Sequence, residues 1–172
     1  MGLSSPGSNK VFTSEEDFLR FMGTNQFEYE RLEHPAVFTC EEADRYHTGI
    51  EAVHTKNLFL CDKKKRHFFL VVTACEKTVR LDSLAARLGV WHLSFASEEN
   101  LEKFLGVGRG AVTMMGLVND NEHRVALWID KAIWSGERFL CHPLVNTATL
   151  VLSKAELERF FALTGHVPNL FD

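Results

Sequence analysis

The fold is decided by two apolar stretches, Asn57-Leu-Phe-Leu-Cys61 and Phe68-Phe-Leu-Val-Val-Thr-Ala74. Both have the length of a β-strand, and the segment that joins them, Asp62-Lys-Lys-Lys-Arg-His67, is short and basic. Two such runs around a short polar segment predict a β-hairpin with a basic turn. The second run is the longest apolar run in the chain and is far short of the roughly 20 residues of a membrane-spanning helix, so we expect no membrane partner.

Helical patterns lie on both sides of this hairpin. Thr13 and Glu16 have the spacing of a capping box, and apolar residues follow them at helical spacing. Ser153 and Glu156 repeat that spacing before the last predicted helix. Two further N-caps are predicted at Thr39 and Ser97, and helices are predicted to end at Gly23, Gly89, Gly106 and Gly165.

Strands and helices alternate without any repeat. Short strands are predicted at 27–33, 91–95, 125–129, 139–140 and 149–152, and the Gly-rich segment 106–116 is predicted to be a loop that enters a strand. This mixture predicts an α+β (mixed α/β) fold, a single domain with a largely antiparallel mixed sheet flanked by helices. Residues 1–10 are rich in Ser, Gly and Pro and predict a disordered tail, so the domain is expected to span 11–172.

Net charge, the N-terminal residues and the spacing of cysteines and histidines limit the classes of function that the chain can have. The formal net charge of −4 excludes a strongly cationic nucleic-acid-binding protein, but it allows a protein that holds the end of a nucleic acid through a local patch. The N-terminus has no basic apolar signal sequence, so we expect a soluble cytoplasmic protein. The histidines and cysteines lack zinc-ligand spacing, which predicts no metal site, and we expect all four cysteines to be reduced: Cys40, Cys61, Cys75 and Cys141.

Three segments carry polar residues within apolar strands. They are His54-Thr-Lys-Asn-Leu-Phe-Leu60, Gly106-Val-Gly-Arg-Gly-Ala-Val-Thr-Met-Met-Gly-Leu-Val-Asn-Asp120 and Phe139-Leu-Cys-His-Pro-Leu-Val-Asn-Thr-Ala-Thr149. Together with Leu93-Ser-Phe-Ala-Ser97, they resemble the YbaK/prolyl-tRNA synthetase-associated domain family of aminoacyl-tRNA editing proteins. Within that family the chain is most similar to the PrdX deacylase domain-containing branch, from about residue 12 to the C-terminus.

The resemblance implies a function. Members of this family hydrolyse the ester between a wrong amino acid and the terminal ribose of a tRNA, with no metal, cofactor or covalent enzyme intermediate. The branch implies a trans-editing deacylase for Ala-tRNA(Pro), with the aminoacylated tRNA end as partner and prolyl-tRNA synthetase as a further partner. Two alternatives stay open: a Cys-tRNA(Pro) deacylase, and a non-catalytic module that binds tRNA or a synthetase.

The resemblance also assigns site residues. From spacing alone, Lys56 is a strand-edge lysine that faces solvent, but it matches the essential lysine of the family, where an ammonium could hold the terminal phosphate or the ester carbonyl. His142 matches a wall of the amino-acid pocket, and Asn146 is the stronger candidate among the polar residues that follow it. The remaining residues expected to contact substrate are Asn57, Gly108, Gly110, Thr113 and Thr147.

Two features of these segments have a second interpretation. The basic turn residues Lys63, Lys64 and Lys65 are typical of a solvated hairpin, and the alternative is contact with acceptor-stem phosphates of the tRNA. Met114-Met115 stand where many relatives have Pro and another apolar residue, which places the size of the predicted pocket in question. The Gly-rich loop lacks a Gly-Lys-Ser/Thr ending, so we expect no nucleoside triphosphate site.

Overall fold

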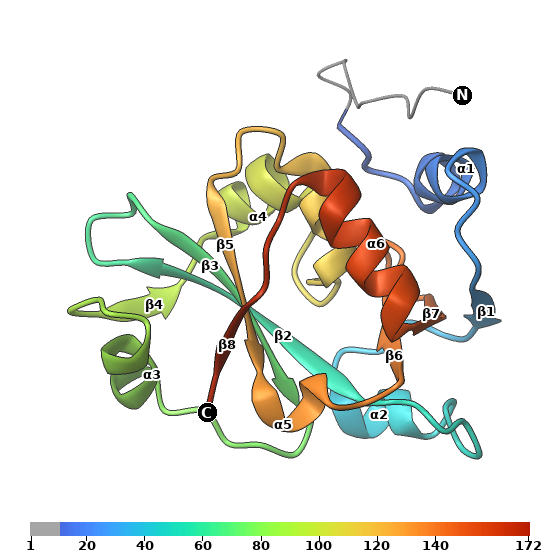
Figure 1. Ribbon diagram of the computed structural model, residues 1–172, viewed down its shortest axis with the longest axis horizontal. Helices are drawn as coiled ribbons and strands as arrows, with labels where there is room; N and C mark the ends of the chain where they lie inside the picture. The colour runs from blue at the N-terminus through green and yellow to red at the C-terminus, as the bar shows by residue number, and fades with distance from the viewer. Residues whose placement is uncertain (1–10) are drawn as a thin grey trace.

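The computed structural model describes residues 11–172, so the tail predicted at 1–10 lies outside the described residues. The chain forms one domain of two β-sheets with helices around them (Figure 1). The strands are β1 (Glu30–Glu33), β2 (Thr55–Asp62), β3 (Phe68–Ala74), β4 (Leu93–Phe95), β5 (Val125–Asp130), β6 (Arg138–Cys141), β7 (Ala148–Ser153) and β8 (Asn169–Phe171). The helices are α1 (Glu15–Thr24), α2 (Cys40–Asp44), α3 (Leu81–Arg87), α4 (Glu98–Leu105), the 3-10 helix η1 (Met114–Asn119), α5 (Lys131–Trp134) and α6 (Lys154–Thr164).

The predicted hairpin is the centre of the larger sheet. Strands β2 and β3 pair antiparallel from Thr55 opposite Ala74 to Cys61 opposite Phe68, which confirms the prediction. The full order is β4-β2-β3-β5-β8, and the β3–β5 and β5–β8 pairs are parallel. The smaller sheet, β1-β7-β6, is wholly antiparallel. The mixed, largely antiparallel fold predicted from the sequence is therefore confirmed.

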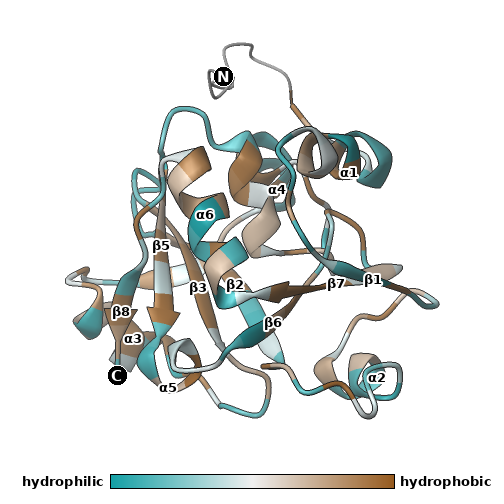
Figure 2. Ribbon diagram, turned by 45° about the vertical axis from the view of Figure 1, so that its right-hand side comes forward, coloured by the Kyte–Doolittle hydropathy of each residue, from teal (hydrophilic) through white to brown (hydrophobic). Residues whose placement is uncertain are grey.

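Both faces of the larger sheet are buried, which explains why its strands are continuous apolar runs rather than alternating ones. Phe59 and Leu70 pack on one face with residues of α1, α4, η1 and α6. Leu60 and Val71 pack on the opposite face against α3. Figure 2 shows β3 as hydrophobic along most of its length.

A short bridge joins the two sheets. The backbone amide of Val53 donates to the carbonyl of Arg138 over 2.7 Å, and the amide of Leu140 donates to the carbonyl of Val53 over 3.2 Å. This bridge brings the start of β2 beside the end of β6. The two segments that resemble the editing family, around residues 56 and 142, therefore meet in space.

Several predicted helix boundaries are confirmed, but both boundaries predicted for α1 are wrong, since the helix continues past Gly23 to Thr24. The hydroxyls of Thr39, Ser97 and Ser153 cap α2, α4 and α6 as predicted. The cap of α1 is Ser14 and not Thr13, because Ser14 has extended backbone geometry and its Oγ accepts from the amide of Asp17. Such a shift by one residue is common where Ser and Thr are adjacent, since either hydroxyl can serve.

The Gly-rich loop does not enter a strand, contrary to the prediction. It continues into η1, whose first amides are capped by Thr113, and all six η1 residues are buried. Gly116 lies against Leu105, where an added Cβ would come within 2.9 Å of the Leu105 Cβ. The segment therefore packs against α4 as η1 instead of pairing with a strand. Helix α5 and strand β8 were not predicted, because both are very short.

The prediction that all four cysteines are reduced is wrong. Cys40 and Cys75 form a disulfide, with Cα atoms 5.8 Å apart, and Cys61 and Cys141 remain as buried thiols. The two bonded residues are 35 positions apart, so sequence spacing gave no sign of the pairing. They meet because the hairpin returns the end of β3 to the N-terminus of α2. Among the described residues, no helix has the length and apolar character needed to cross a membrane.

Candidate active site

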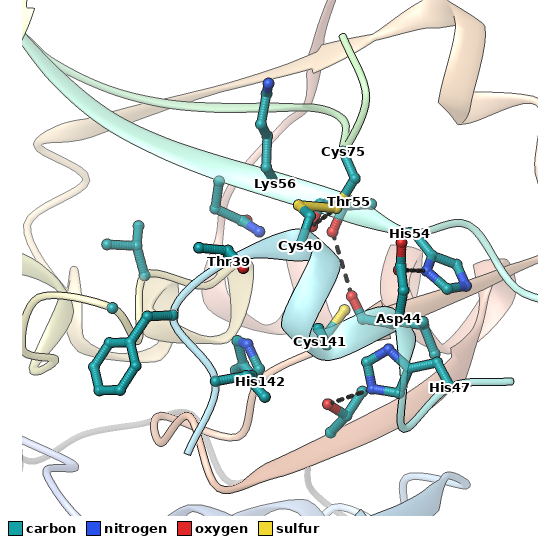
Figure 3. Close-up of a pocket in the computed structure, with 18 residues that line it drawn as sticks. Thr39, Cys40, Asp44, His47, His54, Thr55, Lys56, Cys75, Cys141 and His142 are labelled. Carbon is teal, nitrogen blue, oxygen red and sulfur yellow. Dashed lines mark hydrogen bonds and ion pairs between the residues drawn. A yellow bond between two sulfur atoms is a disulfide. The ribbon is translucent and has the colours of Figure 1, made fainter. Parts of the chain in front are cut away.

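A cavity of about 230 Å³ opens where the two sheets join. Its walls come from the start of β2, the end of β6, helix α2 and the segment that precedes α2 (Figure 3). Apolar residues form one part of the wall: Val37, Phe38, Ala43, Val112 and Leu140. Polar and titratable residues form the rest: Thr39, Asp44, His47, His54, Thr55, Lys56, Asn57, His142 and Thr149, with the Cys40–Cys75 disulfide and Cys141.

Neighbouring residues of β2 play different parts because side chains alternate along a strand. Asn57 lines the cavity, and its Oδ1 is buried without a hydrogen-bond partner in the described part of the chain. Lys56 lies at the rim, and its ammonium donates to the backbone carbonyl of Lys77. Figure 3 shows the Lys56 side chain directed away from His142. The ammonium thus faces an adjoining depression formed with 74–78, rather than the centre of the cavity.

His142 is held rigidly at the end of β6. Its Nδ1 lies 2.9 Å from the carbonyl oxygen of Ala148, so this nitrogen carries the proton and donates. The Thr113 hydroxyl donates to the His142 carbonyl over 2.8 Å, and Pro143 restricts the backbone. Burial lowers the pKa of His142, so its ring is neutral near pH 7. The structure therefore supplies the fixed imidazole that a pocket wall requires.

Cys141 precedes His142 and lines the same cavity. Burial raises the pKa of its thiol to about 12. A thiolate is the nucleophilic form of cysteine, and at this pKa almost none is present near neutral pH. This is consistent with the expectation, from the family resemblance, that no covalent enzyme intermediate forms.

A chain of hydrogen bonds fixes the tautomer of His47. His34 Nδ1 donates to the Pro35 carbonyl over 2.8 Å, so in the neutral ring His34 Nε2 accepts from the Thr149 hydroxyl, also over 2.8 Å. The Thr149 oxygen must then accept from His47 Nε2, at 3.1 Å. Burial lowers the pKa of His47 to about 4, with further lowering by the neighbouring histidines. His47 is therefore neutral, with its unprotonated Nδ1 buried and unpartnered in the described structure.

Asp44 and His54 lie beside this nitrogen. His54 Nδ1 and Asp44 Oδ1 are 2.5 Å apart, and one ligand atom from each of Asp44, His47 and His54 lies within 4.8 Å of the others. Such a group could hold a metal ion. Its members come from α2, the turn after α2 and the residue before β2, so no local spacing motif contains all three and the prediction of no metal-ligand group missed it.

The other predicted substrate residues divide into three groups. Gly110 lines the cavity and has φ +86°, and a Cβ there would lie 2.9 Å from Phe38. Asn146 does not line the cavity but donates from Nδ2 to the Val37 carbonyl over 3.0 Å, which holds the wall in place. Thr147 is exposed, and Gly108 lies outside the lining. Met114 and Met115 also lie outside it, buried in η1.

The basic turn is remote from the cavity. Lys63, Lys64 and Lys65 are exposed beyond the end of β2, whereas the cavity lies at its start (Figure 1). At about 3.3 Å per residue, the strand places them about 23 Å from Thr55. The cavity and the turn would therefore contact different parts of a bound tRNA.

Sequence reasoning missed several residues of the site. Phe38 is 68% exposed although it is a large aromatic residue at the rim. His34, His47 and Thr149 meet only through the fold. An exposed aromatic residue has no sequence signature, but the two histidines flanking α2 were a signal that could have been weighed together.

Comparisons with known proteins identify the family of this chain. A family model described as "Aminoacyl-tRNA editing domain" matches residues 34–160. "Prolyl-tRNA synthetase associated domain-containing protein 1" of Danio rerio is 38% identical over 155 residues, covering 89% of this chain and 82% of that protein. "Prolyl-tRNA editing protein ProX" of Acetoanaerobium sticklandii is 36% identical over 138 residues, covering 80% of this chain and 84% of that protein. A solved structure titled "putative trans-editing enzyme for prolyl tRNA synthetase" aligns with a TM-score of 0.67 and 17% identity, over 92% of this chain and 96% of that one.

Proposed function

We infer, from the premise that this chain belongs to the aminoacyl-tRNA editing domain family, that it hydrolyses mischarged aminoacyl-tRNA in trans. We further propose that the substrate is Ala-tRNA(Pro), with prolyl-tRNA synthetase as the enzyme whose errors are removed. The observation that carries the proposal is the small cavity walled by the fixed imidazole of His142 and by Asn57. A small pocket with a fixed wall admits a small aminoacyl group and excludes a larger one by steric contact.

The buried oxygen of Asn57 supports recognition of an aminoacyl group. A buried acceptor without a partner costs about 1–3 kcal/mol, so a donor supplied by the substrate recovers that cost. The α-ammonium of an aminoacyl ester is such a donor, and a charged donor makes a strong hydrogen bond. We therefore assign Asn57 Oδ1 to the substrate ammonium.

Lys56 is suited to the tRNA rather than to the amino acid. Its ammonium lies at the rim and faces away from His142, toward the depression beside 74–78. We therefore propose that Lys56 binds a phosphate near the terminal ribose rather than the oxyanion. The exposed Phe38 ring at the same rim offers a surface on which the terminal adenine stacks, worth about 1–3 kcal/mol.

The reaction needs little side-chain chemistry because an aminoacyl ester is already activated. Water attacks the carbonyl carbon, the bond from that carbon to the ribose oxygen breaks, and the ribose oxygen takes a proton. The products are the free amino acid and a tRNA with both terminal hydroxyls. The protein positions the ester and excludes the cognate amino acid, which are the tasks the rigid wall performs.

The test is hydrolysis of purified Ala-, Cys- and Pro-tRNA(Pro) by the full chain. We expect Ala-tRNA(Pro) to be hydrolysed fastest. Asn57→Ala should lower kcat/KM by about 5- to 150-fold, as the loss of one hydrogen bond of about 1–3 kcal/mol predicts. His92→Ala, at an exposed position outside the cavity, is the matched control. Hydrolysis of Cys-tRNA(Pro) in preference would assign the alternative substrate, and no hydrolysis above the buffer rate would support the non-catalytic module.

Lys56→Ala separates the two roles of the lysine. If the ammonium binds phosphate, KM for the aminoacyl-tRNA rises while kcat changes little. A fall in kcat with an unchanged KM would contradict the phosphate assignment and indicate that Lys56 stabilises the oxyanion.

A further inference from the structure

We propose that Asp44, His47 and His54 form a binding site for one divalent transition-metal ion, with Zn²⁺ as the best fit. The inference concerns binding and does not rest on the proposed deacylase activity. It stands on two independent observations: the convergence of three ligand atoms, and a buried ligand nitrogen of His47 that has no partner in the described structure.

The distances fit a shared ion. One ligand atom from each residue lies within 4.8 Å of the other two. Ligand atoms bound at about 2.0–2.2 Å around a tetrahedral zinc ion are separated by roughly 3.3–3.6 Å, so small side-chain adjustments bring the three atoms to coordination distance. Figure 3 shows Asp44, His47 and His54 grouped on one side of the cavity.

His47 is already prepared as a ligand. His47 is only 4% exposed, and its Nδ1 carries a lone pair because its Nε2 donates to the Thr149 hydroxyl. The Thr149 oxygen is in turn fixed by His34 and the Pro35 carbonyl. Metal-binding histidines characteristically donate their second ring nitrogen to such a partner, which fixes the tautomer and the ring orientation. The chain of hydrogen bonds thus leaves the lone pair of His47 Nδ1 without a hydrogen-bond partner in the described structure.

Asp44 and His54 complete the ligand set. They share a hydrogen bond of 2.5 Å, and binding replaces it with one metal bond to each, while the His54 proton moves to the other ring nitrogen. Two imidazoles and one carboxylate favour Zn²⁺, Co²⁺ or Ni²⁺ over Mg²⁺ and Ca²⁺, which prefer oxygen ligands alone. All three residues line the cavity, from which a water molecule would supply the fourth ligand.

The test is titration of the untagged, unreduced full chain with Zn²⁺ by calorimetry, and with Co²⁺ by visible absorption. We expect one ion per chain, with absorption bands typical of tetrahedral Co²⁺. His47→Ala and Asp44→Ala should each weaken binding at least tenfold, and His92→Ala, at an exposed position outside the group, should leave it unchanged. The disulfide is kept intact in this assay so that its sulfurs cannot act as ligands.

Thr149→Val tests the orienting role separately. It removes the acceptor of the His47 proton without touching a ligand, and loss of such a partner typically weakens metal affinity about 10- to 100-fold. If His47→Ala does not fold, Asp44→Ala is the deciding variant, because Asp44 is exposed. Failure of the wild type to bind Zn²⁺ or Co²⁺, or equal affinity in Asp44→Ala, would overturn the inference. Binding without deacylation would leave this site standing and reject only the proposed activity.

Discussion

The Cys40–Cys75 disulfide should contribute several kcal/mol to stability, and the loop that it closes sets the magnitude. The bonded residues are 35 positions apart. In the chain-entropy treatment, cross-linking a loop of this length lowers the entropy of the unfolded chain by about 13 cal/mol/K, which corresponds to about 4 kcal/mol at 25 °C. For a domain of this size, such a loss should lower Tm by roughly 8–15 °C.

The same bond should position a wall of the cavity. Helix α2 has five residues and none is buried, so apolar packing holds it weakly. Its attachments to the domain include the disulfide at Cys40 and the hydrogen bond from His54 to Asp44 at its other end. Loss of the disulfide should therefore raise KM for the aminoacyl-tRNA, since Phe38 and Thr39 precede the bonded residue and line the cavity.

Urea denaturation with and without reductant is the assay. Reductant should lower the free energy of unfolding of the wild type by about 4 kcal/mol. It should have no effect on a Cys40→Ser, Cys75→Ser double variant, because Cys61 and Cys141 are not bonded. Thiol titration of the denatured, unreduced wild type should find two thiols, those of Cys61 and Cys141. Four titratable thiols, or a reductant effect that persists in the double variant, would refute the reasoning.

His142→Ala should enlarge the cavity, so that Pro-tRNA(Pro) begins to be hydrolysed while Ala-tRNA(Pro) hydrolysis slows. If instead the hydrolysis rates of both substrates fell equally, by about 10²- to 10⁴-fold, His142 would be a general base. Burial opposes ionisation of Asp120, but hydrogen bonds from His166 and two backbone amides outweigh it and hold the pKa of that carboxyl below its usual range. At pH 7, Asp120→Asn should therefore be less stable than the wild type by the full contribution of this carboxylate. This difference should begin to shrink as pH falls below about 4, where the unfolded carboxyl takes up its proton, and should be absent below the lowered native pKa. A difference in urea midpoint between the two proteins that does not change with pH would contradict this. Replacing residues 63–65 by alanine should change kcat/KM less than threefold, because the turn is remote from the cavity. If the slope of the logarithm of the tRNA binding constant against the logarithm of salt concentration fell by about 0.7–0.9 per lysine replaced, the turn would contact tRNA phosphates instead.

The sequence by itself determined the main elements of the fold. The apolar runs of β2 and β3 around a basic turn admit little other than a hairpin, and the caps at Thr39, Ser97 and Ser153 are local hydrogen bonds that neighbouring residues decide. Glycines at 106 and 165 end helices because they adopt positive φ, a property of the residue itself. Such features can be predicted because their physical cause lies within a few residues of the chain.

Only the tertiary structure decided the composition of the site. Nothing near Cys40 in sequence indicates Cys75, and nothing near His47 indicates Thr149 as the acceptor of its proton. The same applies to the predicted substrate residues, since Asn57 lines the cavity and Thr147 is exposed although both are polar. Burial, pKa and metal-binding geometry depend on which groups converge from distant parts of the chain, and that convergence is a product of how the two sheets pack.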